Sequence, residues 1–392
     1  MLNHVDVREI VPEEPGSPLE RHGQSPKDGP ALPSGIDLFS ADNHISISED
    51  IFYERFPSKL KDRAPRIWAG DGVYHIGIGG KSFYPPAVVD PLAQFEGRPG
   101  AASNDMDARM ADLDSEGVRR ELAFQNGVLV LCGFPDLEAR SLCIRIYNEY
   151  LAELQDRAPG RFYGVGLISW WDAQAARADL AQLKALGIRT FLLPLRPGVD
   201  ADGELVDYTS DKMRPVWEAI ADSGVPVSHH IGEFPLKTQY NSTIIGFVHN
   251  VATFREMFGS YVMGGILDRH PQLRIGWFEG GINWVPAAIQ DCDHAMASYR
   301  HIQDWKILKD AGSYWREHMY SSFIVDPLGL RLLDLIGADQ VMWASDYPHN
   351  ESTFGYTRSS IRSVAESVDK AELAPVLGGN VARFLDLPVS AI

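Results

Sequence analysis

Residues of the types that bind metal ions stand at the ends of several apolar segments of this sequence. They are Asp42, His44, His230, Glu279 and Asp346. Carboxylate oxygens and imidazole nitrogens together suit a hard or borderline divalent cation. Each residue alone has an ordinary alternative, since Glu279 precedes two glycines of a turn and Asp346 could be a cap or turn residue. Their shared position at the ends of apolar segments is what predicts a metal site.

The apolar segments alternate with helical patterns along the chain. The segments are 38–42, 121–125, 163–169, 188–195, 225–230, 273–279, 319–325 and 340–346, and helices are expected over 136–157, 172–186, 211–223, 247–269, 283–300, 326–337 and 368–377. This alternation predicts parallel βαβ units, and eight strands favour a (β/α)8 TIM barrel. An open doubly wound sheet is disfavoured because no GxGxxG follows the first strand. A barrel gathers the carboxyl ends of its strands at one face, so the five residues are expected to converge there.

The domain organisation follows from shifts in composition. Residues 1–35 are rich in Pro, Gly, Glu and Ser, which predicts a disordered arm. Residues 36–392 are expected to form one metal-dependent TIM-barrel domain. Within it, 51–108 are expected to form a cap-like insertion with a hairpin around the Gly-Asp-Gly turn at 70–72. A second insertion, 231–250, carries aromatic residues that could line a pocket.

Charge and cysteine content exclude some partners and compartments. The formal net charge of −17 argues against nucleic acid and anionic membranes, because binding to either needs a basic face. The three cysteines form no CxxC pair, which fits a reducing cytoplasm and predicts no thiolate zinc site. No apolar run is long enough to span a bilayer, and the N-terminus has no signal-peptide pattern. We therefore expect a cytoplasmic enzyme with a small-molecule substrate, and a homodimer is left open.

Further ligand-type residues lie close in sequence to the five named above. Glu49 follows His44, His229 precedes His230, and His249 is expected to begin the helix after the fifth strand; His349 lies near Asp346. Successive residues of a strand point to opposite faces, so only one of His229 and His230 can point inward. Glu49, His229 and His249 are candidate ligands of a second metal, and the alternative is that they orient the ligands of a single one.

Two longer motifs make the chain resemble a known family. They are GGILDRHPQLRIGWFEGGINWVP at 264–286 and VMWASDYPHNESTF at 341–354. Over residues 36–387 the chain resembles the amidohydrolase-related branch of the amidohydrolase superfamily, the branch of the aminocarboxymuconate-semialdehyde decarboxylase type. The resemblance implies that Asp346, His230 and His44 match ligands of that family. Asp42 and Glu279 stand where many relatives have histidine, and this exchange favours iron or manganese over zinc.

The resemblance implies two enzymatic functions, between which the sequence does not decide. An offshoot of the same branch, the nonheme diiron monooxygenases of diterpenoid antibiotic biosynthesis, implies two irons, an electron donor and a bulky apolar substrate of terpenoid or acyl-CoA type. This is the preferred prediction.

The alternative is a mononuclear hydrolase or decarboxylase with one Zn or Mn, in which Asp346 is the general base. Asp346, His230 and Glu279 are the predicted catalytic residues in either case. A third hypothesis, from another class, is a barrel that only binds a ligand.

Overall fold

The computed structural model describes residues 33–388 with seven gaps, together with Val7 and Ile10. The gaps are 48–49, 71–72, 84–104, 126–127, 233–238, 241 and 305. Nearly all of the predicted arm at 1–35 lies outside the described residues, as does the middle of the predicted cap.

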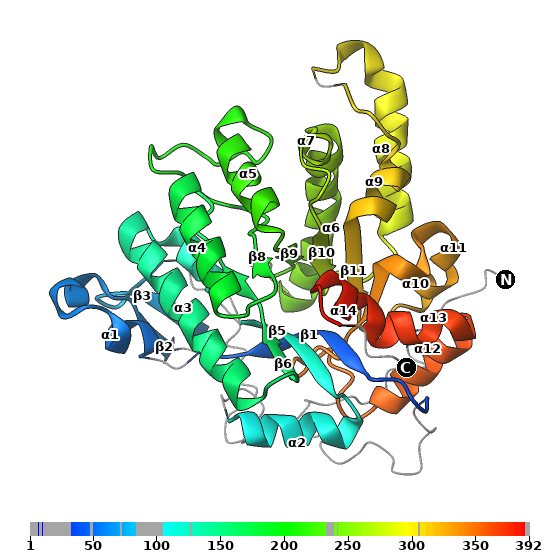
Figure 1. Cartoon of the computed structure of the whole chain (residues 1–392), viewed down its shortest axis with the longest axis horizontal. Helices are drawn as coiled ribbons and strands as arrows, with labels where there is room; N and C mark the ends of the chain where they lie inside the picture. The colour runs from blue at the N-terminus through cyan, green and yellow to red at the C-terminus, as the bar shows by residue number, and fades with distance from the viewer. Residues whose placement is uncertain are drawn as a thin grey trace.

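The centre of the molecule is a run of short, buried, parallel strands (Figure 1). They are β1 (Phe39–Ile45), β5 (Arg120–Gln125), β6 (Phe162–Gly164), β7 (Gly166–Leu167), β8 (Phe191–Leu192), β9 (Val227–His230), β10 (Ile275–Phe278), β11 (Met319–Phe323) and β12 (Val341–Trp343). One sheet has the order β1-β5-β6 and the other β12-β11-β10-β9-β8-β7, with parallel pairing throughout. Each of the eight predicted segments contains a strand, with β6 and β7 sharing the third.

Backbone hydrogen bonds connect the two sheets at both edges. Only Val165 separates β6 from β7, and its N–H donates to Ala123 O at 3.0 Å. At the other edge, the Asp346 N–H donates to Asp42 O at 2.8 Å, and the His44 N–H donates to Tyr347 O at 2.7 Å. Strand pairing as such does not run from β12 to β1. The segment after β12 nevertheless lies against the carboxyl end of β1.

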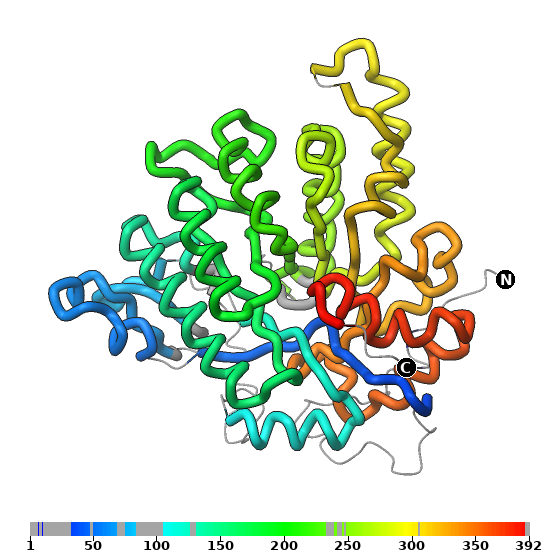
Figure 2. The backbone as a smooth tube through the Cα atoms, in the orientation of Figure 1, coloured from blue at the N-terminus to red at the C-terminus, as the bar shows by residue number. Residues whose placement is uncertain are grey.

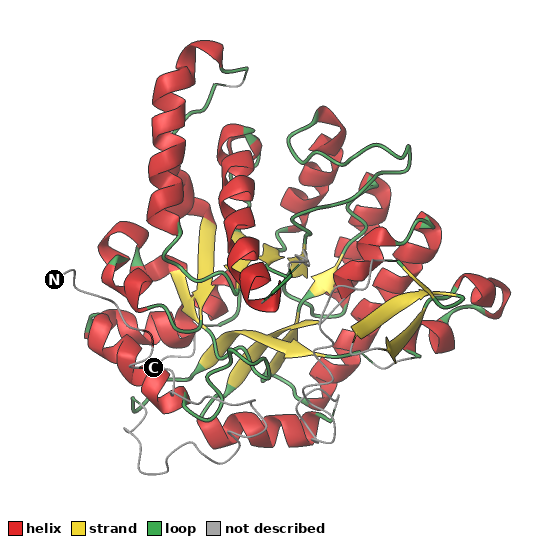
Figure 3. Cartoon of the chain, turned by 180° about the vertical axis from the view of Figure 1, so that it is seen from behind, coloured by secondary structure: helices red, strands yellow, loops and turns green. Residues whose placement is uncertain are grey.

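Helices cover the strands from outside (Figure 3). The longer ones are α2 (Met106–Glu116), α3 (Leu137–Arg157), α4 (Ala173–Ala185), α5 (Arg214–Ser223), α6 (Ser242–Met263), α8 (Val285–Tyr299), α9 (Ala311–His318) and α12 (Thr357–Ser367). The shorter ones are α1 (Ile51–Arg55), α7 (Ile266–Arg269), α10 (Pro327–Arg331), α11 (Leu333–Ile336), α13 (Lys370–Ala374) and α14 (Asn380–Phe384). Every predicted helical range contains a helix, whereas α1, α2, α9, α12 and α14 were not predicted.

Local sequence explains where several helices begin and end. Asp136 and Asp172 accept hydrogen bonds from the N–H groups of Ala139 and Ala175 at the starts of α3 and α4. Gly224 ends α5 in the left-handed conformation, with φ 70°, before β9 begins. In Figure 2 the two ends of the folded chain lie side by side, with the blue β1 against the red C-terminal helices.

The region predicted as a cap contains a small antiparallel sheet apart from the parallel strands. It consists of β2 (Arg66–Gly70), β3 (Val73–Ile78) and β4 (Lys81–Ser82). β2 and β3 form the predicted hairpin. In Figure 1 this sheet lies at one side of the molecule, next to α1. That it covers an active site stays a prediction, because 84–104 are not described.

Candidate metal centre

The five predicted ligands converge at the carboxyl ends of the strands, and His349 joins them. Their ligand atoms form two overlapping sets of four, in which all atoms lie within 4.8 Å of one another. One set is Asp42, His44, His230 and Glu279, and the other is His44, Glu279, Asp346 and His349. We call these six residues the metal-centre cluster. His44 Nε2 lies 3.2 Å from both Glu279 Oε2 and Asp346 Oδ1, and His230 Nε2 lies 3.0 Å from Glu279 Oε2.

Strand alternation explains why β1 supplies two members of the cluster. Asp42 and His44 are two residues apart and share a face, while Asn43 between them points away. The Asn43 side chain is buried and bonds to Glu121 on β5 and to Ser345 after β12. Asn43 therefore bonds β1 to its neighbours, while Asp42 and His44 on the opposite face of the strand form part of the cluster.

Two of the carboxylates sit on strained backbone. Glu279 has φ 67° and Asp346 has φ 55°, the left-handed region that costs most residues of order 1–3 kcal/mol. Two features keep Glu279 in this conformation. Its N–H donates a hydrogen bond to Ser322 Oγ at 3.0 Å, and a tight turn follows it. There Gly280 admits no side chain, since a Cβ would lie 2.3 Å from Phe254. Left-handed residues at the strand ends turn these two carboxylates toward the cluster.

Hydrogen bonds set the tautomer and position of the histidines. His230 Nδ1 donates to Ile231 O at 2.7 Å, which leaves Nε2 as the nitrogen available to a metal. His349 lies one turn after Asp346, with its Nδ1 3.3 Å from Asp346 Oδ1. Its ring stacks on that of His44 with centroids 3.7 Å apart. The Phe124 ring packs against the His230 ring, with centroids 4.6 Å apart, and forms an apolar wall of the cluster.

Burial and mutual interaction shift the pKa values of these groups strongly. Burial raises the pKa of Asp42 to about 6, against the lowering effect of His230. Burial raises the pKa of Asp346 to about 6 in the same way, against the effect of His349. Burial lowers the pKa of His44 to about 4, and the neighbouring His349 adds to that shift. For His349, burial lowers the pKa, but the neighbouring carboxylates, Asp346 foremost and then Glu279, together outweigh it and raise the value to about 10.

The cluster fits a divalent cation on chemical grounds. Both carboxylate oxygens of Asp42 and of Asp346 are buried and have no hydrogen-bond partner among the residues that the structure describes. His230 Nε2 and His44 Nδ1 are buried without a hydrogen bond as well. Buried charges are normally paired or coordinate a metal, because leaving a carboxylate dry and unpaired is costly. Oxygen and imidazole donors facing one point are what a hard or borderline divalent ion requires.

The structure corrects the expectation for His229 and His249, two of the three further candidate ligands. His229 points to the opposite face of β9, where its Nδ1 bonds to Leu193 O at 2.7 Å and its Nε2 to Tyr261 Oη at 2.8 Å. With both nitrogens engaged, it has none left for a metal. His249 lies inside α6, which begins at Ser242, and its side chain is exposed. Glu49 lies outside the described residues.

His349 is the member of the cluster that the sequence did not identify as a ligand. The available signal was weak, a histidine three residues after the predicted ligand Asp346. The chain turns there, with the His349 N–H donating to Asp346 O at 2.9 Å, and this turn brings the imidazole back over the cluster.

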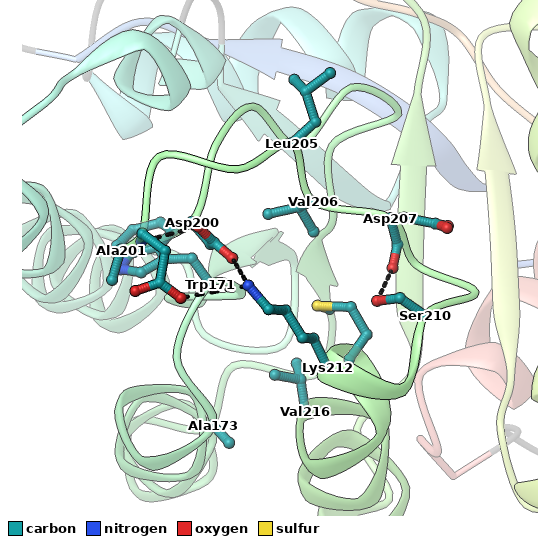
Figure 4. Close-up of a pocket in the computed structure, with 12 residues that line it drawn as sticks. Trp171, Ala173, Asp200, Ala201, Leu205, Val206, Asp207, Ser210, Lys212 and Val216 are labelled. Carbon is teal, nitrogen blue, oxygen red and sulfur yellow. Dashed lines mark hydrogen bonds and ion pairs between the residues drawn. The ribbon is translucent and has the colours of Figure 1, made fainter.

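A separate cavity lies on the outside of the strands (Figure 4). It has a volume of about 250 Å³, and Trp171, Val206, Met213 and Val216 form its apolar lining. Three acidic residues of the loop after β8, which we call the surface acid cluster, surround the Lys212 ammonium: Asp200, Asp202 and Glu204. None of the six residues of the metal-centre cluster lines this cavity.

Comparisons with known proteins agree with this architecture. The family model described as Amidohydrolase matches residues 84–387. The structure is similar to that of an amidohydrolase from Mycobacterium avium subsp. paratuberculosis, with 19% sequence identity and a TM-score of 0.72, covering 90% of this chain and 100% of that one. It is similar to a 2,6-dihydroxybenzoate decarboxylase from Rhizobium, with 17% identity and a TM-score of 0.65, covering 90% and 99% of the two chains.

A third similar structure contains a metal. It is a dihydroxybenzoic acid decarboxylase from Polaromonas with bound manganese and the inhibitor 2-nitroresorcinol. Its identity to this chain is 16% and the TM-score is 0.63, covering 90% of this chain and 97% of that one. At these identities the likeness concerns the fold. Among the described residues, no helix is both long and apolar enough to cross a membrane.

Proposed function

The chain belongs to the amidohydrolase family, whose fold is the TIM barrel, and we propose that it is a metal-dependent decarboxylase or hydrolase of a small organic acid. The observation that carries this proposal is the set of buried carboxylate oxygens of Asp42 and Asp346, gathered with imidazole nitrogens at the strand ends and without a lysine or arginine partner among the described residues. The decarboxylases with similar folds support it over the oxygenase preferred from sequence.

Asp42, His44, His230, Glu279 and Asp346 are the residues proposed to hold the metal. Three carboxylates and two imidazoles form a hard donor set, which favours manganese or iron over zinc. The Polaromonas decarboxylase contains manganese, and we therefore propose one Mn per chain, with Zn as the alternative. A bound divalent ion supplies Lewis acidity, which polarises a substrate oxygen and lowers the pKa of a water molecule.

Asp346 and His349 are the proposed proton carriers. Burial raises the pKa of Asp346 to about 6. A general base works best when its pKa is close to the pH of the reaction, so this value suits Asp346 to that role. His349 Nδ1 lies 3.3 Å from Asp346 Oδ1, so a proton can pass between imidazole and carboxylate. In a decarboxylation this pair would deliver the proton that replaces carbon dioxide on the substrate. Phe124 and the buried setting of the cluster exclude bulk water from this transfer.

The test is a decarboxylation assay with hydroxylated aromatic carboxylic acids, in the presence and absence of Mn²⁺. We expect metal-dependent release of carbon dioxide, lost after treatment with a chelator and in the Asp346→Asn variant. His249→Ala is the matched control, because this histidine is exposed and outside the cluster. Protein that binds no divalent ion would overturn the proposal. Protein that binds Mn²⁺ and is inactive on every such acid would limit it to the hydrolase form, tested with esters and amides.

A second candidate function rests on one specific observation. Asp42 belongs to only one of the two overlapping ligand sets, and Asp346 belongs only to the other. The cluster is therefore larger than a single set of four ligand atoms. Two cations would fit this extended shape, and the diiron monooxygenase predicted from sequence needs such a pair. It would also need an electron donor and a CoA-linked or terpenoid substrate. Two irons per chain and substrate-dependent oxygen uptake with a reductant would favour it, and one Mn or Zn with anaerobic turnover would exclude it.

A further inference from the structure

A buried ion pair lies directly behind the metal-centre cluster and takes no part in the chemistry proposed above. Arg109 on α2 and Glu121 on β5 are both fully buried. Arg109 Nε and Nη2 donate to Glu121 Oε1 and Oε2, both at 2.7 Å. Glu121 Oε2 also accepts a hydrogen bond of 2.6 Å from Asn43 Nδ2. The three side chains form a chain of contacts from α2 to β1.

The charge of this pair dictates how the Asn43 amide is oriented. Both Glu121 oxygens accept hydrogen bonds from the Arg109 guanidinium, a group that can only donate. Glu121 therefore requires the NH2 end of the Asn43 amide, and the carbonyl end must face the other way. Asn43 Oδ1 is thus fixed as an acceptor on the side of the strand where the segment after β12 lies.

That acceptor holds the two residues on either side of Asp346. Asn43 Oδ1 accepts hydrogen bonds from Ser345 Oγ at 2.7 Å and from the Tyr347 N–H at 2.9 Å. The Asp346 N–H between them donates to Asp42 O at 2.8 Å. Every backbone N–H from 345 to 347 is therefore bonded to β1, since the Ser345 N–H donates to Ser40 Oγ at 2.8 Å.

The α2 helix holds the same segment by a second route. The Tyr347 hydroxyl donates to Asp112 Oδ2 at 2.6 Å, and Arg109 lies over the Tyr347 ring at 5.2 Å. These contacts keep Asp346 in its left-handed conformation, which an unrestrained aspartate would leave.

We propose that Asn43 is a positioning residue for the metal centre, and that the Arg109–Glu121 pair sets its amide orientation so that Asp346 is presented to the cation. The inference rests on the proposed metal site. Residues that orient metal ligands without touching the metal commonly change metal affinity ten- to a hundredfold when they are replaced. Asn43 acts in this way through the backbone around Asp346.

The test compares two Asn→Asp variants at buried positions. Asn43→Asp keeps the size and the acceptor but loses the donor to Glu121, and it places two carboxylates face to face. We expect its Mn²⁺ affinity, measured by calorimetry, to fall ten- to a hundredfold, and the electron paramagnetic resonance spectrum of bound Mn²⁺ to change. The matched control is Asn380→Asp, because Asn380 is fully buried and donates to Ala338 O and Val341 O at the opposite end of β12. It should lower the melting temperature and leave Mn²⁺ affinity and spectrum unchanged.

The double variant Asn43→Asp with Glu121→Gln adds a rescue test. The amide introduced at position 121 can donate to the carboxylate introduced at position 43, and the total charge stays the same. We expect part of the lost affinity to return, which a purely structural role would not require. Unchanged affinity and spectrum in Asn43→Asp would overturn the inference.

A milder variant keeps the inference testable if Asn43→Asp does not fold. Ser345→Ala removes a single hydroxyl that donates to Asn43 Oδ1, and it should lower Mn²⁺ affinity several-fold with little change in melting temperature. Parental affinity in Ser345→Ala, together with an unfolded Asn43→Asp, would overturn the inference in favour of a purely structural role. Absence of Mn²⁺ binding in the parent protein would instead reject the metal site itself.

Discussion

The acidic residues of the metal-centre cluster and those of the surface acid cluster differ in what neutralises them. In the surface cluster, the Lys212 ammonium lies 2.6–3.3 Å from all three carboxylates, and the lysine side chain is 57% exposed. In the metal centre, Asp42 and Asp346 are 0% exposed, and their oxygens lack hydrogen-bond partners among the described residues. In the surface cluster a lysine pairs with carboxylates that water can also reach. Among the described residues, no lysine or arginine forms an ion pair with Asp42 or Asp346, which water cannot reach.

The pKa shifts of Asp42 and Asp346 in the metal centre are opposite in sign to the shift of Asp200 in the surface cluster. Burial raises the pKa of Asp42 and of Asp346 to about 6, because the charged form loses its hydration. For Glu279, the third carboxylate of the metal centre, burial also raises the pKa, but His230 and His44 outweigh it and the net shift is downward.

Slight burial also raises the pKa of Asp200, but the N–H of Glu204 and the Lys212 ammonium outweigh it and the net shift is downward. Asp200 is thus stabilised as an anion by its own loop and by Lys212. Asp42 and Asp346 face imidazoles alone among the described residues, and the proposed metal would supply the positive charge there.

Burial alone does not explain the difference, as the Arg109–Glu121 pair shows. Glu121 is as deeply buried as Asp346, yet it has a guanidinium with two hydrogen bonds and an amide donor from Asn43. Its charge is satisfied within the fold. The metal centre is therefore the place where the fold leaves buried charge for a ligand to neutralise.

The largest effect is expected from breaking the internal pair. Arg109→Met leaves the Glu121 carboxylate buried without its cation, which typically costs 3–5 kcal/mol of unfolding free energy. We expect a large fall in the free energy of unfolding, measured by urea denaturation. Adding Glu121→Met should recover part of that loss, because an apolar pair of similar size is tolerated there, and the Asn43 donor left unpaired limits the recovery. If Arg109→Met were as stable as the parent, buried carboxylates in this protein would not need a cation.

A smaller effect is expected from adding the cation proposed for the metal centre. Mn²⁺ at about 100 times its dissociation constant should add about 2.7 kcal/mol to the free energy of unfolding, because it binds only the folded chain. Asp346→Asn should lose this stabilisation, since it removes one ligand charge. Without added metal the variant should be about as stable as the parent, because removal of a buried carboxylate and loss of its contact with the His349 imidazole, 3.3 Å away, act in opposite directions. A variant destabilised without metal but still stabilised by Mn²⁺ would contradict both expectations.

Much of this site could be predicted from the sequence, because it depends on strand periodicity. Asp42 and His44 share a face by alternation, and the carboxyl ends of parallel strands meet at one end of the fold. His349 could not be ranked above other histidines, since its place depends on the turn created by the left-handed Asp346. His249 was expected at the start of the helix after the fifth strand. It lies inside that helix, because α6 begins at Ser242, earlier than its predicted start at 247.

The helix that supports the site was missed for a physical reason. The buried face of α2 includes Arg109, Asp112 and Glu116 along with its apolar residues, so it shows no clear apolar stripe at helical spacing. Arg109 and Asp112 can lie inside because partners on other elements bond to them, Glu121 on β5 and Tyr347 after β12. A pattern based on hydrophobicity cannot register such a helix, since the partners are distant in sequence.

The smallest effect is expected at the surface acid cluster, where Lys212→Met removes the shared ammonium. The three carboxylates are then unpaired but accessible to water, and the loop keeps the hydrogen bonds from the N–H groups of Asp202 and Glu204 to Asp200 Oδ1 at 2.9 and 3.0 Å. Exposed ion pairs contribute little because water and salt replace the lost partner, so we expect the melting temperature to change by no more than about 2 °C. Lys309→Met, which removes another exposed ammonium paired with Glu317, is the matched control and should behave alike. A much larger loss in Lys212→Met than in Lys309→Met, reversed by added Mn²⁺, would show that the loop also needs a cation and would remove the contrast between the two clusters.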